Sequence, residues 1–282
     1  MAGEKNVTVP WIAGAPQRGE RLVMVTAYDY PQARAAEAAG VDIVLVGDSL
    51  AMVVLGYADT LSVTMDEMVH HTKAVRRGLK RPLLVADMPY GSFHLGREQA
   101  VGNALRFIKE AGAQAVKIEG DRPELVSAMV QAEVPVMAHL GLTPQSLHRL
   151  GGFKVQGRDE ATRQTILTAA RELEEAGAFS LVLEAVPTDL AAEVTKELSI
   201  PTIGIGAGAE CDGQVLVYHD LLGLEERIAP RFVRRYAELG KLSREAIAQF
   251  AEDVRSGDFP RPEESYGGTV RPAEETLKKL YG

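Results

Sequence analysis

The sequence predicts a (β/α)8 TIM barrel, a closed fold of the α/β class, with extra C-terminal helices. Two observations support this fold: eight short apolar runs alternate with helical patterns, and the 282 residues are close to the roughly 250 typical of such barrels. The runs are continuously apolar rather than alternating, as expected for parallel strands covered on both faces. They span residues 22–26, 42–46, 83–86, 115–118, 134–138, 180–183, 202–205 and 214–217.

The segments between the runs have the spacing of amphipathic helices. Apolar side chains recur every three or four positions within residues 65–78, and residues 158–176 show the same period. A short Glu-Ala-Gly repeat precedes three of the runs and ends at Gly40, Gly112 and Gly177. Because glycine readily takes the left-handed conformation that terminates helices, the repeat predicts a helix end just before each of these strands.

The alternative fold is an open, doubly wound sheet with a dinucleotide site. That fold places a G-x-G-x-x-G loop between its first strand and first helix. Here the first run continues into Ala27-Tyr-Asp-Tyr30, and the only glycine-rich candidate, Gly204–Gly208, follows the seventh run with a different spacing. The pattern therefore favours the barrel.

Further helices are expected after the eighth run, over residues 231–239 and 243–256. In the second, Ser243 is the predicted N-cap, and Ile247, Phe250 and Val254 form the predicted buried face. Several Pro and Gly residues make 257–272 linker-like, and the last ten residues have a helical pattern. We expect a lead-in over residues 1–20, the barrel with its C-terminal helices over 21–256, and a linker-like tail over 257–282.

The composition is that of an ordinary globular protein, with 46% hydrophobic and 25% charged residues. The net charge of −8 has the wrong sign for a nucleic-acid-binding protein. The single cysteine, Cys211, cannot form an internal disulfide, which fits a reducing compartment. We find no signal-peptide pattern and no apolar run of about 18 residues, so we expect a cytoplasmic protein that does not interact with membranes.

Ionisable side chains end five consecutive strands. In a parallel barrel the carboxyl ends of the strands form the active-site face, so these side chains should converge on one rim. The simpler interpretation, that each caps a helix or faces solvent, fits any one of them better than all of them together. The side chains are Asp48 after the second run, Asp87 after the third, Lys117 and Glu119 at the fourth, His139 after the fifth and Glu184 after the sixth.

Three of these groups, Asp48, Asp87 and Glu119, are carboxylates on adjacent strands. Oxygen ligands without clustered Cys or His indicate a hard cation such as Mg2+ or Mn2+. Lys117 and Glu119 are two residues apart and point the same way, which suits an anionic substrate bound between lysine and metal. The alternatives are a structural Lys–Glu pair and a Schiff-base lysine, and nearby carboxylates disfavour the latter.

Other features are weaker indications of function. The Gly204–Gly208 segment has the position of a phosphate-binding loop. The alternative is a tight loop whose glycines only allow neighbouring segments of the chain to pass close to it. His70 and His71 point in different directions on a helix, which favours surface or packing roles, and Cys211 is not expected to be a nucleophile. The segment 50–63 is unusually apolar for a connection, which suits a lid or a subunit contact.

Six motifs together resemble the ketopantoate hydroxymethyltransferase family. The resemblance covers about residues 21–266, and the tail beyond Gly267 and the segment before Leu22 depart from the family's pattern. The motifs are Thr26-Ala-Tyr-Asp29, Leu45-Val-Gly-Asp-Ser49, Val116-Lys-Ile-Glu-Gly120, His139-Leu-Gly-Leu-Thr-Pro-Gln-Ser146, Gly151-Gly-Phe-Lys-Val-Gln-Gly-Arg158, and Ile203-Gly-Ile-Gly-Ala-Gly208 with Asp212-Gly-Gln214.

The resemblance implies a (β/α)8 barrel, a homodecamer, and a reaction that uses Mg2+ and 5,10-methylenetetrahydrofolate. It implies transfer of a hydroxymethyl group to a small 2-oxo acid, 3-methyl-2-oxobutanoate, giving ketopantoate for pantothenate synthesis. The family's metal ligands fall on Asp48, Asp87 and Glu119, and its proton acceptor falls on Glu184. Its substrate contacts fall on Asp48, Ser49, Asp87 and Lys117.

The resemblance is compatible with an enolate mechanism in which Glu184 acts as base and His139 has an accessory role. Two other functions remain open. One is a Mg2+-dependent lyase or mutase acting on other 2-oxo acids, which would need no folate. The other is a non-catalytic sensor of 2-oxo acids or metal, which would bind ligand without turnover.

Overall fold

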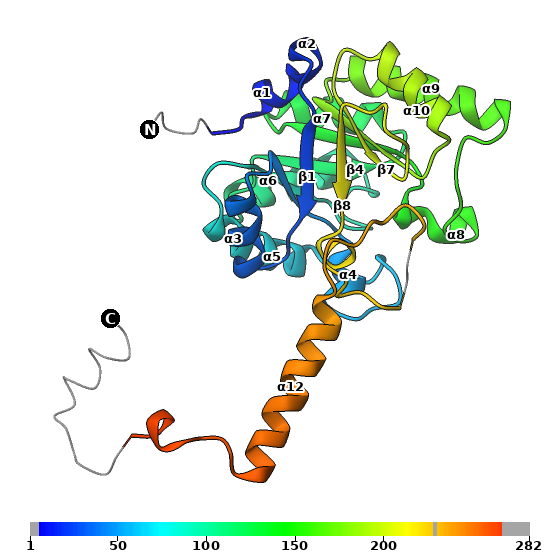
Figure 1. Cartoon of the computed structure of the whole chain (residues 1–282). Coiled ribbons are helices and arrows are strands. Elements are labelled where there is room, and N and C mark those ends of the chain that lie inside the picture. The colour runs from blue at the N-terminus through cyan, green and yellow to red at the C-terminus, as the bar shows by residue number, and fades with distance from the viewer. Residues whose placement is uncertain (1–5, 228–229, 267–282) are drawn as a thin grey trace.

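The computed structural model describes residues 6–227 and 230–266. Its centre is a closed barrel of eight parallel strands in sequential order, with helices around the outside (Figure 1). The predicted (β/α)8 barrel is therefore confirmed. The strands are β1 Leu22–Thr26, β2 Ile43–Val46, β3 Leu83–Asp87, β4 Ala115–Glu119, β5 Val136–Gly141, β6 Ser180–Glu184, β7 Thr202–Ile205 and β8 Gly213–Leu216.

All eight predicted runs coincide with these strands to within a few residues. The register places Glu119 of β4 beside His139 of β5, and Gly141 of β5 beside Glu184 of β6. Because every strand runs in the same direction, the polar ends of the strands meet at one face of the barrel.

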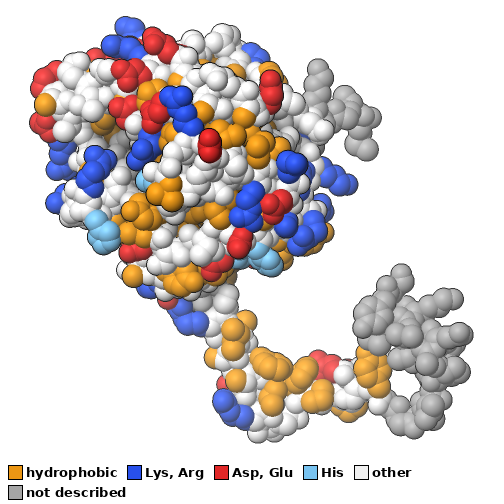
Figure 2. Space-filling view, turned by 180° about the vertical axis from the view of Figure 1, so that it is seen from behind, with side chains coloured by type: hydrophobic (Ala, Val, Ile, Leu, Met, Phe, Trp, Pro, Cys, Tyr) orange, Lys and Arg blue, Asp and Glu red, His pale blue; other side chains and the backbone are white. Residues whose placement is uncertain are grey.

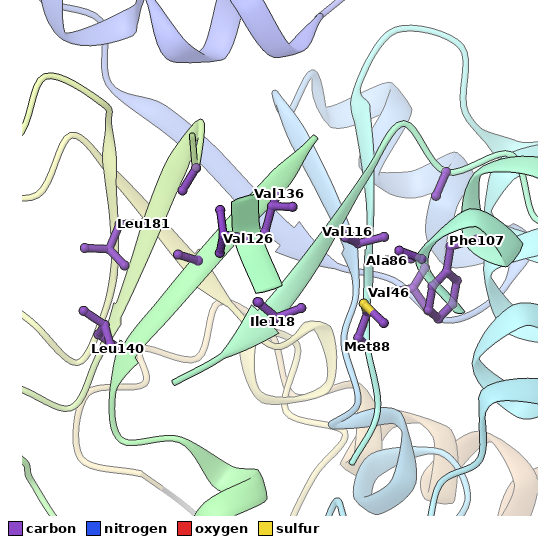
Figure 3. Close-up of a cluster of buried hydrophobic side chains, with 14 of the residues drawn as sticks. Val46, Ala86, Met88, Phe107, Val116, Ile118, Val126, Val136, Leu140 and Leu181 are labelled. Carbon is purple, nitrogen blue, oxygen red and sulfur yellow. The ribbon is translucent and has the colours of Figure 1, made fainter. Parts of the chain in front are cut away.

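The core has two layers, because successive side chains of each strand point alternately into the barrel and out towards the helices. Met24, Leu45, Val85 and Ile203 belong to the inner layer. The outer layer joins the strands to the helices, and its side chains are buried. Figure 3 shows part of it, with Val116, Ile118, Val136 and Leu181 from the strands, Phe107 from the helix α6 (Arg97–Lys109) and Val126 from the helix α7 (Pro123–Gln131).

Six helices pack around the barrel, and they confirm the predictions for residues 65–78 and 158–176. Thr64 and Glu67 form a capping box at the start of α5, and Asp159 caps α9. Gly40, which follows α3, is left-handed with φ 75°, as predicted. The helices are α3 Tyr30–Ala39, α5 Met65–Gly78, α6 Arg97–Lys109, α7 Pro123–Gln131, α9 Glu160–Glu175 and α10 Thr188–Glu197.

Shorter elements close the ends of the barrel. The lead-in folds into α1 and α2, and Ile12 of α1 packs into the inner layer of the core. None of the helices within 6–227 and 230–266 is long and apolar enough to cross a membrane. The short elements are α1 Val9–Ala13, α2 Ala15–Arg18, α4 Leu50–Val53, α8 Leu147–Leu150, α11 Tyr218–Leu221, and the 3-10 turns Pro144–Ser146 and Pro262–Glu264.

The C-terminal helices differ from the prediction. Residues 231–238 are not helical, and α12 (Leu239–Ser256) begins four residues before Ser243. The Ser243 hydroxyl donates to the carbonyl of Leu239 within the helix, so it is not the N-cap. The predicted buried face is also wrong: Ile247, Phe250 and Val254 are 67%, 54% and 48% exposed. Their pattern is amphipathic, but α12 projects from the barrel (Figure 1). The ring of Phe259, which follows the helix, packs on Phe250 with their centroids 5.3 Å apart. The helix expected over the last ten residues lies outside the described residues.

Candidate active site

The ionisable strand ends converge on one cavity at the carboxyl face of the barrel. Asp48 lies two residues after the end of β2, Asp87 ends β3, and Lys117 belongs to β4. The cavity has a volume of about 850 Å³. Its lining includes all of the predicted site residues: Asp48, Ser49, Asp87, Lys117, Glu119, His139 and Glu184.

Lys117 is the centre of this cluster. Its Nζ is 2.9 Å from Asp87 Oδ1, 3.8 Å from Glu119 Oε1 and 3.2 Å from His139 Nδ1. All four side chains are buried. Burial opposes a charge on Lys117, yet the surrounding carboxylates raise its pKa. The surrounding acids therefore favour the charged form of the lysine, which disfavours the neutral amine that a Schiff base needs.

The three carboxylates of the rim differ in their electrostatics. Burial, together with the charges of Asp87 and Glu119, raises the pKa of Asp48 well above its usual value. Burial also raises the pKa of Asp87, although Lys117 opposes the rise. For Glu119, burial is outweighed by hydrogen bonding to His139 and by the charge of Lys117, and its pKa is lowered. Three acids therefore share one lysine, and the repulsion that raises the pKa values of two of them is one that a bound cation would relieve.

The type of donor atom determines which cation these carboxylates could bind. Among the described residues, no group of three or more His, Cys, Asp and Glu side chains is placed to enclose a metal ion by itself. Mg2+, however, is usually held by one or two carboxylates, with water or substrate completing its shell. Asp48 and Asp87 are adjacent, since the Asp48 amide is 3.2 Å from Asp87 Oδ2. The residues present fit such a cation.

His139 connects the lysine to Glu184. Its Nδ1 is 3.2 Å from Lys117 Nζ, and its Nε2 is 3.3 Å from Glu184 Oε2. Nδ1 is also 3.6 Å from Glu119 Oε1. Burial and the charge of Lys117 oppose a proton on His139, yet its contacts with Glu119 and Glu184 raise its pKa. His139 therefore lies between two acids of the site, Glu119 and Glu184.

Gly141 allows β5 and β6 to approach each other beside Glu184. It has φ 92°, and a Cβ at this position would overlap the backbone carbonyl oxygen of Glu184. Only glycine combines the left-handed conformation with this close contact. This contact explains why the third residue of the HLGLTPQS motif, two residues after His139, is glycine.

Gln145 is a site residue that the sequence did not indicate. Its Nε2 donates to Asp48 Oδ2 and to the carbonyl of Met88, both at 2.9 Å, and its backbone N–H donates to Glu119 Oε2 at 3.0 Å. One residue of the loop after β5 therefore ties down two carboxylates of the rim. Its position in the same HLGLTPQS motif is the feature of the sequence that could have indicated this role.

Ser49 is held from the opposite side of the cavity. Its hydroxyl is 2.8 Å from the hydroxyl of Tyr28, which is fully buried. The backbone carbonyl of Tyr28 is 2.7 Å from His71 Nδ1. His71 therefore has a packing role, as predicted, and the Ser49 hydroxyl is positioned at the edge of the cavity.

Aromatic and glycine residues line another part of the cavity. Phe153 and Phe232, both partly exposed, line it together with Gly206 and Gly208 of the predicted glycine loop. In the segment 50–63, Met52 and Val53 of α4 line the cavity, so part of this segment borders the site. Cys211 is buried and does not line the cavity, which agrees with its predicted lack of a role.

Solved structures with similar folds belong to enzymes with much less similar sequences. Phosphonopyruvate hydrolase in complex with oxalate and Mg2+ aligns with a TM-score of 0.58 at 15% identity, over 97% of this chain and 95% of that one. Oxaloacetate acetylhydrolase aligns with a TM-score of 0.60 at 14% identity, over 99% and 100%. At this identity the likeness shows the shared barrel fold alone.

Sequence relatives are much closer. The 3-methyl-2-oxobutanoate hydroxymethyltransferase of Carboxydothermus hydrogenoformans is 53% identical over 278 residues, which cover 98% of this chain and 99% of that protein. The enzyme of the same name from Moorella thermoacetica is 55% identical over 268 residues, covering 94% and 100%. Since so little of the chain is left unmatched, the expectation that the tail is an addition is wrong.

The family model for ketopantoate hydroxymethyltransferase matches residues 6–262. The match begins well before Leu22, so the expectation that the lead-in departs from the family is also wrong. Together with the relatives, it confirms the resemblance found in the six motifs. The chain belongs to the ketopantoate hydroxymethyltransferase family.

Proposed function

We propose that the cavity transfers a hydroxymethyl group from 5,10-methylenetetrahydrofolate to 3-methyl-2-oxobutanoate. The products are ketopantoate and tetrahydrofolate, water supplies the new hydroxyl oxygen, and the reaction is the first step of pantothenate synthesis. The observation that carries the proposal is the cluster around Lys117: a buried cation and three carboxylates border one cavity in a chain of this family.

The 2-oxo acid binds against Lys117 and Ser49 in this proposal. The ammonium group of Lys117 donates a charge-assisted hydrogen bond to the substrate carboxylate. The Ser49 hydroxyl, held by Tyr28, donates a second one. Asp48 and Asp87 complete the substrate contacts from the neighbouring strands.

Asp48 and Asp87 hold Mg2+, with Glu119 beside them, since an excess of buried negative charge favours a divalent cation. When bound, Mg2+ would act as a Lewis acid that stabilises negative charge on the substrate's keto oxygen. Gln145 keeps Asp48 and Glu119 in position through its two hydrogen bonds. The excess of carboxylates over Lys117 supports this assignment.

Glu184 accepts the proton from C3 of the oxo acid. The imidazole of His139 lies beside it, with Nε2 3.3 Å from Glu184 Oε2. Water cleaves the two C–N bonds of the folate's methylene carbon, which gives tetrahydrofolate and a carbon at the oxidation level of formaldehyde. The carbanion at C3 adds to this carbon, and the alkoxide that forms takes a proton to become the new hydroxyl group. The cavity of about 850 Å³ is larger than a five-carbon acid requires, which leaves room for the folate.

A product assay by mass spectrometry tests this function. Purified protein is incubated with 3-methyl-2-oxobutanoate and 5,10-methylenetetrahydrofolate, with Mg2+ or with EDTA. Ketopantoate formed only with metal and folate is the expected result. Turnover of 2-oxo acids without folate would indicate the lyase or mutase function instead, and binding without turnover would indicate a sensor. The location in the cytoplasm and the tenfold assembly stay predictions.

A further inference from the structure

Asp220 is a carboxylate of the cavity that has no part in the reaction steps proposed above. It belongs to α11, which follows β8 directly and is tied to β1 by a hydrogen bond of 2.8 Å from the Tyr218 amide to the Thr26 hydroxyl. Figure 2 shows Asp and Glu side chains on the outer surface of the molecule, where water solvates their charges. Asp220 differs from these because it is half-buried and lines the cavity.

The Asp220 carboxylate has neither a hydrogen bond nor an ion pair within the part of the chain that the structure describes. Glu225, the acid that lines the cavity closest to it in the sequence, already pairs with Arg227 at 2.7 Å. Burial and the charge of Glu225 raise the pKa of Asp220, although Arg235 opposes the rise. Because a partly buried carboxylate without donors is costly, a ligand that supplies N–H groups would stabilise its charged form.

The strand order places Asp220 across the cavity from Lys117. The strand β4, which carries Lys117, and the strand β8, which α11 follows, are four strands apart in either direction around the closed barrel. In the proposed function the 2-oxo acid binds against Lys117. The folate therefore occupies the side of the cavity that Asp220 borders.

An aromatic ring borders the same side. Phe232 lines the cavity and packs against Gly206, since a Cβ at position 206 would lie 2.7 Å from its ring. The segment that carries Phe232 runs beside α11, because the amide of Tyr236 donates to the carbonyl of Leu221 at 2.8 Å. A flat ring bound here can meet both an aromatic face and a carboxylate. The glycine loop thus has a packing role, which is to leave room for Phe232.

The parts of a folate differ in what they offer to a carboxylate. Its glutamate tail is anionic, so Asp220 repels it. The aminopyrimidine ring of the pterin has two adjacent donors, N3–H and the 2-amino group, which match the two oxygens of a carboxylate. Lys154 and Arg231, which line the cavity and are exposed, suit the anionic tail instead.

We infer that Asp220 binds the pterin ring of the folate by accepting hydrogen bonds from N3–H and the 2-amino group, while Phe232 packs on the face of the ring. The inference rests on the proposed function for the identity of the co-substrate. It goes beyond that function by assigning residues of this chain to one part of the folate. Asp220 and Phe232 thereby position the methylene carbon, which the folate carries beside its pterin ring.

Exchanging a donor for an acceptor in both partners tests the inference. The probes are 6-methylpterin, which has the 2-amino donor, and 6-methyllumazine, which has a 2-oxo acceptor in its place. Asp220→Asn makes the matching change, because a side-chain amide can accept from N3–H and donate to the 2-oxo group. Asp121→Asn is the control, since Asp121 is an exposed aspartate after β4 that does not line the cavity. Fluorescence titration of the full-length proteins measures the affinity for each probe.

The parent protein and Asp121→Asn should bind 6-methylpterin about tenfold or more tightly than 6-methyllumazine, and Asp220→Asn should reverse this order. Circular dichroism checks that each variant is folded. The inference is overturned if folded Asp220→Asn keeps the order of the parent. It is equally overturned if the parent does not prefer the pterin, including the case in which it binds neither probe.

Steady-state kinetics distinguish a failure of this inference from a failure of the proposed function. In Asp220→Asn the KM for 5,10-methylenetetrahydrofolate should rise about tenfold or more, and this rise should exceed any change in the KM for the 2-oxo acid. A parent protein that forms no ketopantoate would contradict the proposed function. If the parent forms ketopantoate and Asp220→Asn has the parent's KM for the folate, only the inference about Asp220 is wrong.

Discussion

Gln145 donates a hydrogen bond of 2.9 Å from its side-chain amide to Asp48 Oδ2. The same residue donates its backbone N–H to Glu119. One residue of the loop after β5 therefore holds two acids of the rim in position. Groups that orient metal-binding carboxylates commonly affect metal affinity about as strongly as some of the ligands do.

Replacing Gln145 with Leu should weaken Mg2+ or Mn2+ binding about 10- to 100-fold, because Asp48 loses the donor that orients it. Isothermal titration of the metal-free protein measures this affinity directly. Gln131→Leu is the control, since Gln131 is a glutamine on α7 that contacts only Ser127. Equal metal affinity in Gln145→Leu and the parent would show that Gln145 does not position the metal ligands.

Replacing Lys117 with Met should lower kcat/KM for the 2-oxo acid about 100-fold. The substrate carboxylate loses a charged hydrogen-bond donor worth about 1.5–3 kcal/mol, and the nearby acids lose their shared cation. Lys154→Met, which removes an exposed lysine elsewhere in the same cavity, should have a much smaller effect. If steady-state kinetics gave similar losses for both variants, the central role of Lys117 would be refuted.

Gly141→Ala should lower the free energy of unfolding by about 2 kcal/mol or more, because a left-handed alanine is strained and its Cβ meets the Glu184 carbonyl. Gly120 is a close control: its φ of 91° matches the 92° of Gly141, but a Cβ there has no atom within 4 Å. Urea unfolding should therefore show a smaller loss for Gly120→Ala. Equal losses would mean that the contact with Glu184 is unimportant.

Asp220, which lines the cavity, should make stability depend on pH. Burial, assisted by Glu225 and opposed by Arg235, raises its pKa from 3.8 to about 6. The folded state thus holds this proton more tightly than the unfolded state does. The associated stabilisation is complete below pH 3.8 and is lost as the pH rises through 6.

Asp220→Asn cannot lose that proton, so its stability relative to the parent should rise between pH 4 and pH 7. The pKa of Asp159, in contrast, is lowered by hydrogen bonds from Thr162. For Asp159→Asn the difference from the parent should therefore move in the opposite direction. Urea unfolding at several pH values measures both differences, and a difference for Asp220→Asn that does not change with pH would contradict the prediction.

The strands were predictable because each is buried on both sides and therefore continuously apolar. Val44 and Val46 of β2, for example, face outward but lie under helices, so their strand has the same composition on both faces. The convergence of Asp48, Asp87, Lys117 and Glu184 followed from this topology alone, since parallel strands end at one rim. The barrel fold and the convergence of these side chains could therefore both be predicted from short stretches of the sequence.

Two features were not predictable, for different physical reasons. The amphipathic period of α12 indicates an apolar stripe around Phe250, but a period cannot tell whether the stripe packs on its own barrel or remains unpartnered. Gln145 is an uncharged residue in a loop, and its role depends on a hydrogen bond to Asp48 across 97 positions of the chain. Such long-range polar contacts leave no periodic trace in a single sequence.

The most direct test of the proposed chemistry is exchange of the C3 hydrogen of 3-methyl-2-oxobutanoate in D2O, followed by NMR with Mg2+ present and folate absent. We predict that the parent protein catalyses this exchange. We predict that Glu184→Gln slows it at least 100-fold, since it removes the proton acceptor, and still binds the oxo acid in a titration. Exchange at the parent rate in Glu184→Gln would contradict the account, because another group would then take the proton.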